Sequence, residues 1–190
     1  MPEVDDVFRV QNYYPLFAHC SMPATFAFLR DPEIAALAAG ETSGKHVESA
    51  IRRISDAMRP FSGKRFVSTD FAAPTDSPRY CSPKRGSVVS AESGWFSLAG
   101  SARIRSLAAR GKVQCVCVRK FRVFDVPREF RLFIRDGELV AMSQRHLVRH
   151  FRRLEGRREE YWRVVQEFFR EIREILPVSS LAMDVYITSN

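Results

Sequence analysis

The sequence predicts an α+β fold, because segments with helical spacing come first and strand-like segments dominate the second half. Apolar residues recur at helical spacing over 45–58, and Pro60 ends that helix. Asp136-Gly137 separates two apolar runs, 130–134 and 138–142, as in a hairpin with a type I′ turn. We therefore expect a sheet with helices on one side.

The remaining elements are predicted from periodicity and from residues that start or stop helices. Asp31, Pro32 and Glu33 form a helix start, and Gly40 ends that helix. Further elements are a short helix at 99–109, a long amphipathic helix at 161–176, and strands at 65–71, 113–124 and 181–187.

Two segments are predicted to lack long regular elements. Pro15 and Pro23 limit any long helix in 8–28, which we interpret as packed loops and short strands. Residues 72–94 are rich in Ser, Pro, Gly and Thr, which predicts a mobile surface loop that could serve as a lid.

Length and composition predict one cytoplasmic domain. The chain has 190 residues, 45% of them hydrophobic, which is enough for a real core. No apolar run reaches the roughly 20 residues that cross a bilayer, and the first residues lack a signal-peptide pattern. We therefore expect the cytosol or the nucleus, and no membrane partner.

The net charge of +8 suggests a polyanionic partner: nucleic acid, an acidic protein surface or phosphates. Much of the basic charge lies in 149–173, where glutamates are interleaved along a predicted helix. A solvated helix face explains that pattern better than a nucleic-acid footprint, since no aromatic-basic RNA motif accompanies it.

The four cysteines show no spacing typical of a disulfide framework or a zinc site. Cys115 and Cys117 lie two apart in a predicted strand, so their side chains share one face. We expect both to pack inward as small hydrophobes, with metal ligation as the alternative.

Charged residues are unusually frequent in the predicted central strand and hairpin. We expect these residues to be neighbours in one sheet: Arg119, Lys120, Glu129, Arg131 and Arg145. Because Phe130, Leu132 and Ile134 point to one face, Glu129 and Arg131 share the other. There they could form a surface salt-bridge network or meet a bound phosphate, and spacing alone leaves both open.

The run from Arg128 to Arg145 resembles the hairpin of the cell division cycle protein 123 family. It reads Arg-Glu-Phe-Arg-Leu-Phe-Ile from 128, Asp-Gly-Glu-Leu-Val from 136 and Ser-Gln-Arg from 143. Val-Arg-Lys-Phe at 118–121 resembles the family's preceding Leu-Arg-Lys-Trp strand, and Phe168-Phe169 lies in the matching helix. Met-Asp-Val-Tyr at 183–186 is similar to Phe-Asp-Val-Tyr, and Tyr-Tyr-Pro-Leu-Phe at 13–17 to Trp-Tyr-Pro-x-Phe. The resemblance thus covers most of the chain.

This resemblance implies an ATP-grasp-like fold that holds Mg-ATP between two sheets. The expected organisation is one domain, 1–190, with an N-terminal lobe at 1–112 and a C-terminal lobe at 113–190 whose sheet is mainly antiparallel. The resemblance also implies a chaperone-like role in assembling eukaryotic translation initiation factor 2 through its gamma subunit.

The resemblance further implies roles for single residues. Arg119, Lys120 and Phe121 would form the hinge beside the adenine, and Arg131 and Arg145, with Glu129 on the same face, would lie at or near the phosphates. Asp184 would be the first magnesium ligand. No catalytic residue is implied.

The sequence departs from the family pattern in two places. Where the family usually reads Pro-Lys-Leu-Asn-Trp-Ser-Ser-Pro-Lys/Arg-Asp, this chain has Ser68 and Thr75 at the basic positions. ATP affinity should be weaker unless Lys64 or Lys84 substitutes; Lys84 is the better candidate, and a solvated loop lysine is the alternative. The family's following Asp-Phe-Asn-Pro segment, which supplies further magnesium ligands, lies beyond Asn190, so we expect either a truncated chain or an incomplete metal site.

The leading hypothesis is a binding protein, an ATP-grasp-like assembly factor that need not turn ATP over. The alternative is an ATP-grasp ligase that activates a carboxylate as an acyl phosphate, with Arg131 and Arg145 stabilising the transferring phosphate. A basic RNA-binding protein, which rests on charge alone, ranks last.

Overall fold

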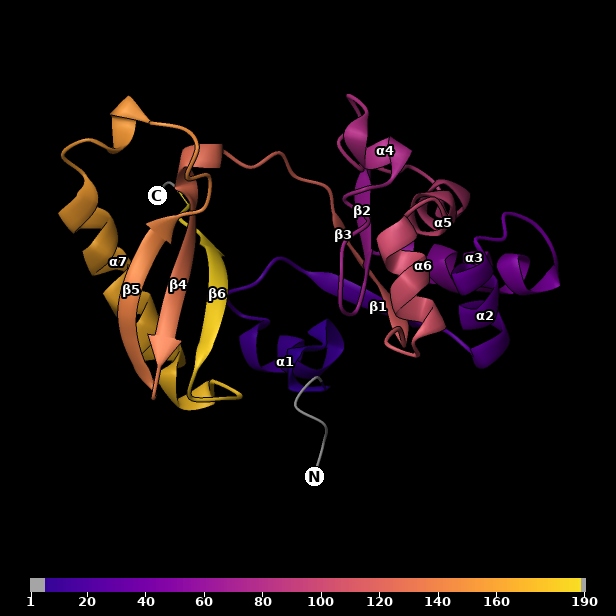
Figure 1. Ribbon diagram of the computed structural model, residues 1–190, viewed down its shortest axis with the longest axis horizontal. Coiled ribbons are helices and arrows are strands. Elements are labelled where there is room, and N and C mark those ends of the chain that lie inside the picture. The colour runs from indigo at the N-terminus through magenta and orange to yellow at the C-terminus, as the bar shows by residue number, and fades with distance from the viewer. Residues whose placement is uncertain (1–5, 189–190) are drawn as a thin grey trace. The chain divides into compact units, whose positions relative to one another are not determined.

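The chain divides into two compact units, and the predicted α+β class is confirmed (Figure 1). A computed structural model describes residues 6–188. One unit extends to Phe121, and the other begins at Arg122. No helix among residues 6–188 is long and apolar enough to span a bilayer.

The first unit is a three-stranded antiparallel sheet with helices around it. Strand β3 is central and pairs with β1 on one side and β2 on the other. Its elements are a 3-10 helix (Asp6–Phe8), α1 (Val10–Phe17), β1 (Ala24–Phe28), α2 (Asp31–Ala39), α3 (Lys45–Met58), β2 (Arg65–Thr69), α4 (Pro78–Cys81), α5 (Ala91–Ala99), α6 (Ala102–Ala109) and β3 (Cys115–Lys120).

One face of this sheet carries the hydrophobic core. Val116 and Val118 of β3 are fully buried among side chains of α2, α3, α5 and α6. Trp95, with no exposed surface, anchors α5 and donates from its indole Nε1 to the Glu41 carbonyl at 2.8 Å. The predicted helix over 45–58 is confirmed, because its apolar spacing matches the face that the core buries.

The other face of the sheet packs against α1. Tyr14 of α1 lies edge-on to Phe26 of β1, and its hydroxyl accepts a hydrogen bond from the Ala24 N–H at 3.0 Å. Cys115 and Cys117 are on this face and are buried, as predicted, and burial raises the pKa of both thiols.

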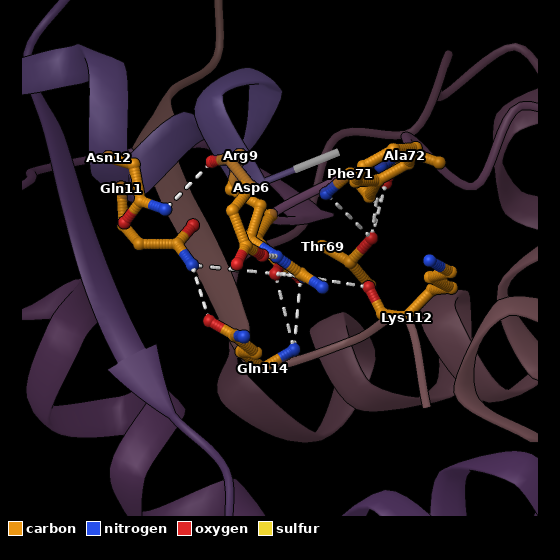
Figure 2. Close-up of polar contacts among 10 residues, drawn as sticks. Asp6, Arg9, Gln11, Asn12, Thr69, Phe71, Ala72, Lys112 and Gln114 are labelled. Atoms are coloured by element: carbon orange, nitrogen blue, oxygen red, sulfur yellow. Dashed lines mark hydrogen bonds and ion pairs between the residues drawn. The ribbon is translucent and has the colours of Figure 1, made fainter. Parts of the chain in front are cut away.

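A buried ion pair between Arg9 and Asp70 joins the start of α1 to this sheet. Only 5% of the Arg9 side chain and none of the Asp70 carboxylate is exposed. Arg9 also donates to Asp6 at 2.8 Å and to the Lys112 carbonyl at 2.9 Å (Figure 2). The Asp70 carboxylate accepts from the Gln114 N–H at 3.2 Å. Each charge is therefore paired and hydrogen-bonded, as a buried charge must be.

Two sequence predictions for the first unit are wrong. Residues 10–17 form a helix despite Pro15. The proline removes only one backbone N–H donor, and the helix is only eight residues long. Residues 72–94 are not a plain surface loop: α4 and the start of α5 lie in this segment, and Ser77 and Val88 are fully buried. Val88 also pairs with Arg65 in an isolated bridge. The small polar residues there cap and connect helices.

The second unit is a three-stranded antiparallel sheet covered by one long helix. Strand β4 is central, between β5 and β6. Its elements are a 3-10 helix (Val126–Arg128), β4 (Glu129–Arg135), β5 (Glu138–Gln144), a 3-10 helix (Arg152–Leu154), α7 (Arg158–Ile172), a 3-10 turn (Arg173–Ile175) and β6 (Leu181–Tyr186). Phe130 of β4 packs against Tyr161 of α7, with ring centroids 5.4 Å apart. Phe169 of α7 is buried, and its neighbour Phe168 is partly buried.

The predicted hairpin is confirmed. Asp136 and Gly137 have φ of 52° and 77°, the left-handed backbone that a type I′ turn requires at both central positions. The register then shifts by one residue, since Ile134 pairs with Leu139 but Phe133 pairs with Ala141. Val140 is therefore the extra residue of a β-bulge.

We expect Asp70→Ala to lower the free energy of unfolding by about 3–5 kcal/mol, because it removes the buried partner of Arg9 and leaves only the more exposed Asp6. Urea unfolding followed by circular dichroism measures this loss. Asp56→Ala is the matched control, because Asp56 pairs with Arg59 at 2.7 Å with both side chains exposed, and it should cost less than about 1 kcal/mol. Equal losses of unfolding free energy in the two variants would show that the buried ion pair contributes no more stability than an exposed one.

Candidate functional site

The open face of the second unit's sheet gathers charged side chains from all three strands. In β4, Phe130, Leu132 and Ile134 are buried, so Glu129 and Arg131 point to the opposite face. The register places Arg131 directly opposite Asp184 of β6 and opposite Ser143 of β5. Arg145 follows β5, and its N–H donates to the Glu129 carbonyl at 3.0 Å.

Asp184 is the centre of this cluster, because two arginines donate to its carboxylate. Arg131 binds it with both ends of its fork, Nε to Oδ1 at 2.7 Å and Nη2 to Oδ2 at 2.9 Å. Arg145 Nε reaches Oδ2 at 3.0 Å. The three side chains are each a little over 40% exposed, so solvent reaches the cluster. The sequence predicted these residues for one site, and the sheet brings them together.

The electrostatics of the cluster follow from this geometry. The hydrogen bonds from Arg131, and then those from Arg145, lower the pKa of Asp184 below its ordinary value, against the opposing effect of partial burial. The same contact raises the pKa of Arg131. Asp184 is therefore a carboxylate whose charge is already balanced by two cations.

A small pocket of about 160 Å³ lies beside the cluster. Asp184, Arg145 and Glu129 form its polar side, and Phe124 and Tyr186 its aromatic side. The two rings are 4.8 Å apart between centroids. The sequence analysis did not assign either aromatic residue to the site. Phe124 could have been noticed, because it lies close to the predicted hairpin and belongs to no predicted core face.

The hinge residues lie in a different sheet from the hairpin, so the prediction that all five charged residues share one sheet is wrong. Arg119 and Lys120 end β3, which pairs with β1 and β2 in the first unit, and Phe121 follows. Strands adjacent in sequence pair only when the connection allows it, and here residues 121–128 lead from one sheet into another. Lys84, the other predicted nucleotide contact, is an exposed residue between α4 and α5.

Arg119 has neighbours that the sequence did not indicate. Its guanidinium lies beside the Tyr13 hydroxyl of α1 and the Cys117 thiol. Burial raises the pKa of Tyr13, and the nearby Arg119 charge opposes that rise. The two positions at which the family has a basic residue and this chain does not are also in the first unit. Ser68 pairs with Cys117 in the sheet, and Thr75 is exposed.

The open face suits phosphate oxygens better than a metal ion. Arg131 uses two of its five N–H donors on Asp184, and Arg145 uses one, so both retain donors for an anion. Both oxygens of Asp184 already accept from guanidinium groups, which oppose a cation. Among residues 6–188, no group of three His, Cys, Asp or Glu side chains could hold a metal. The residues here do not fit a magnesium site formed by the protein alone.

The chain is thus an α+β protein with two antiparallel sheets and with arginines on one open sheet face. Residues 100–190 match the family model described as D123. The fold is similar to that of C-terminally truncated Cdc123 from Schizosaccharomyces pombe, with a TM-score of 0.80, 17% identity and coverage of 97% of this chain and 80% of that one.

A second structure of Cdc123 from Schizosaccharomyces pombe is similar with a TM-score of 0.79, 16% identity and the same coverage of both chains. No curated protein matches the chain. Residues 100–190 are thus similar to the D123 family, and the chain has the fold of Cdc123. The resemblance to the cell division cycle protein 123 family is thereby confirmed.

We expect the stability effect of Asp184→Asn to depend on pH. Since the folded pKa of Asp184 is lowered, its ion pairs contribute fully above about pH 4, the pKa of an unfolded aspartate, and the contribution is lost as pH falls through the folded pKa. The half-exposed pairs should contribute less than about 1 kcal/mol at neutral pH.

Urea unfolding of both proteins over a pH series measures this difference. Asp136→Asn, which alters a carboxylate that is 83% exposed, is the control and should show almost none. A difference that grows on acidification would contradict the assigned ion pairs.

Proposed function

We propose that the chain is an ATP-binding assembly factor that binds the gamma subunit of eukaryotic translation initiation factor 2 and promotes assembly of that complex. The D123 match and the Cdc123 fold support the proposal at the level of the family. The observation that carries the nucleotide part is the convergence of Arg131, Arg145 and Asp184 on one open sheet face.

The convergence supports phosphate binding because the shared carboxylate holds two flexible cations in place. An arginine side chain loses rotamer freedom when it binds a ligand, and Asp184 has already restricted both side chains. Their remaining N–H donors match the fork geometry that recognises phosphate oxygens. The pocket beside Phe124 and Tyr186 leaves space next to these donors.

The same cluster supports binding rather than turnover. Phosphoryl transfer depends on metal ions that bridge the phosphates and neutralise developing charge. Asp184 is balanced by Arg131 and Arg145, and the part of the chain that the structure describes holds no further carboxylate cluster. The ligase alternative therefore lacks support from these residues.

We expect Mg-ATP at saturating concentration to raise the melting temperature, since a ligand at about 100 times its Kd adds about 2.7 kcal/mol of stability. Arg131→Ala removes a charge-assisted contact to the phosphates and should weaken ATP binding by about tenfold or more. Thermal shift and isothermal titration calorimetry measure the two effects.

Arg170→Ala is the matched control, because Arg170 is exposed on α7, which packs on the opposite face of the sheet. It removes the same charge and should leave the Kd for ATP unchanged. If Mg-ATP does not stabilise the wild-type protein, or if both variants weaken binding equally, the proposed nucleotide site is wrong.

The assembly role has its own test. Immobilised protein should capture purified initiation factor 2 gamma subunit, detected by immunoblot, and should release no ADP when amines and carboxylates are added with Mg-ATP. Failure to retain the gamma subunit would remove the assembly role. ADP release that requires both an amine and a carboxylate would instead establish the ligase.

A further inference from the structure

We propose that residues 147–158, which link β5 to α7, form a docking surface for an acidic segment of a partner protein that also carries aliphatic side chains. We call this stretch the basic-aliphatic segment; Figure 1 shows its path from the end of β5 to the start of α7. It does not include Arg145, so it is a site separate from the proposed nucleotide site.

The first observation is an aliphatic pair with no protein contact to explain it. Leu147 is 78% exposed and Val148 is 96% exposed, and they are adjacent. Phe151 and Leu154, in the same segment, are by contrast partly buried. Single exposed hydrophobic residues are ordinary, but two neighbours that the fold leaves almost fully in water are a patch that a partner can cover.

The second observation is a set of cations without counter-charges. Arg149, Arg152 and Arg158 are exposed, and none makes an ion pair within residues 6–188. Their neighbours differ, since Arg153 pairs with Asp125 and Arg157 with Glu160. The three free guanidinium groups thus lie along the same twelve residues as the aliphatic pair and are available to carboxylates of another chain.

The backbone of the segment is ordered by its own turns. The N–H of Arg149 donates to the His146 carbonyl at 3.2 Å, that of Leu154 to Phe151 at 2.9 Å, and that of Arg157 to Leu154 at 3.2 Å. Gly156 supplies a left-handed residue, with φ of 72°. A surface ordered before binding loses less conformational entropy when a partner docks.

Charge complementarity selects an acidic protein segment over other polyanions. Glu155 lies within the segment and Glu159 and Glu160 follow it at once, so an anionic bilayer or a nucleic-acid backbone would also approach these carboxylates. A narrow peptide can place its acids on the arginines alone. Phe151 is partly buried and the exposed His150 ring lies 3.1 Å from the Glu155 carboxylate, whereas single-stranded nucleic acid needs free aromatic platforms.

The test uses a fluorescein-labelled synthetic peptide in which Glu-Glu and Leu-Val pairs alternate, titrated with the full chain by fluorescence anisotropy. Arg149→Ala/Arg152→Ala and Leu147→Ser/Val148→Ser should each weaken binding by about fivefold or more. Arg163→Ala/Arg170→Ala, on exposed positions of α7, is the charge-matched control and should change the Kd by less than about twofold. All four altered positions of the segment are exposed, so circular dichroism and the melting temperature should match those of the wild type.

Four results would overturn the proposal. Equal weakening by the control pair would mean that net charge alone attracts the peptide. If the Leu147/Val148 variant binds the peptide as the wild type does, the aliphatic pair does not contribute to binding. If a peptide with Gln in place of Glu binds equally well, the arginines do not recognise its carboxylates. Tighter binding of phosphatidylserine vesicles or single-stranded RNA than of the peptide, lost in the same variants, would assign the segment to a membrane or to nucleic acid. None of these outcomes bears on ATP binding at Arg131.

Discussion

The Arg9–Asp70 ion pair is the constraint on which the first unit depends, because it joins three segments far apart in the sequence. Asp70 follows β2, its carboxylate accepts from the backbone just before β3, and its carbonyl accepts from the Val10 N–H at the start of α1. A buried pair of this kind gains little net energy over an apolar replacement, but it tolerates few alternative arrangements. It therefore fixes where α1 lies on the sheet, and with α1 the position of Tyr13 beside Arg119.

The two units use charge in contrasting ways. The first buries its ion pair, so the carboxylate of Asp70 is committed to holding the fold together. The second leaves Asp184 and its two arginines half-exposed on a sheet whose other face is sealed by α7. Half-exposed pairs contribute little stability, which leaves their remaining donors free for a ligand. The same chemical groups thus serve structure in one unit and are available for binding in the other.

Much of the fold could be predicted from local patterns, whereas the sheets could not. The turn at Asp136-Gly137, the helix over 45–58 and the shared face of Glu129 and Arg131 follow from backbone preference and side-chain period. The partners of β3 depend on contacts between distant segments, and no period in its residues encodes them. The aromatic pair Phe124 and Tyr186 escaped prediction for the same reason, since 62 positions separate the two residues.

The bulge at Val140 has a consequence for the open face of the second sheet. Side chains alternate along a regular strand, so unbroken alternation from Leu139 to Arg145, six positions later, would point both the same way, and Leu139 lies opposite the buried Ile134. The bulge reverses the alternation between them and turns Arg145 towards Asp184. The distortion at Val140 thus decides on which side of the sheet the second arginine lies, while the hairpin turn stays the same.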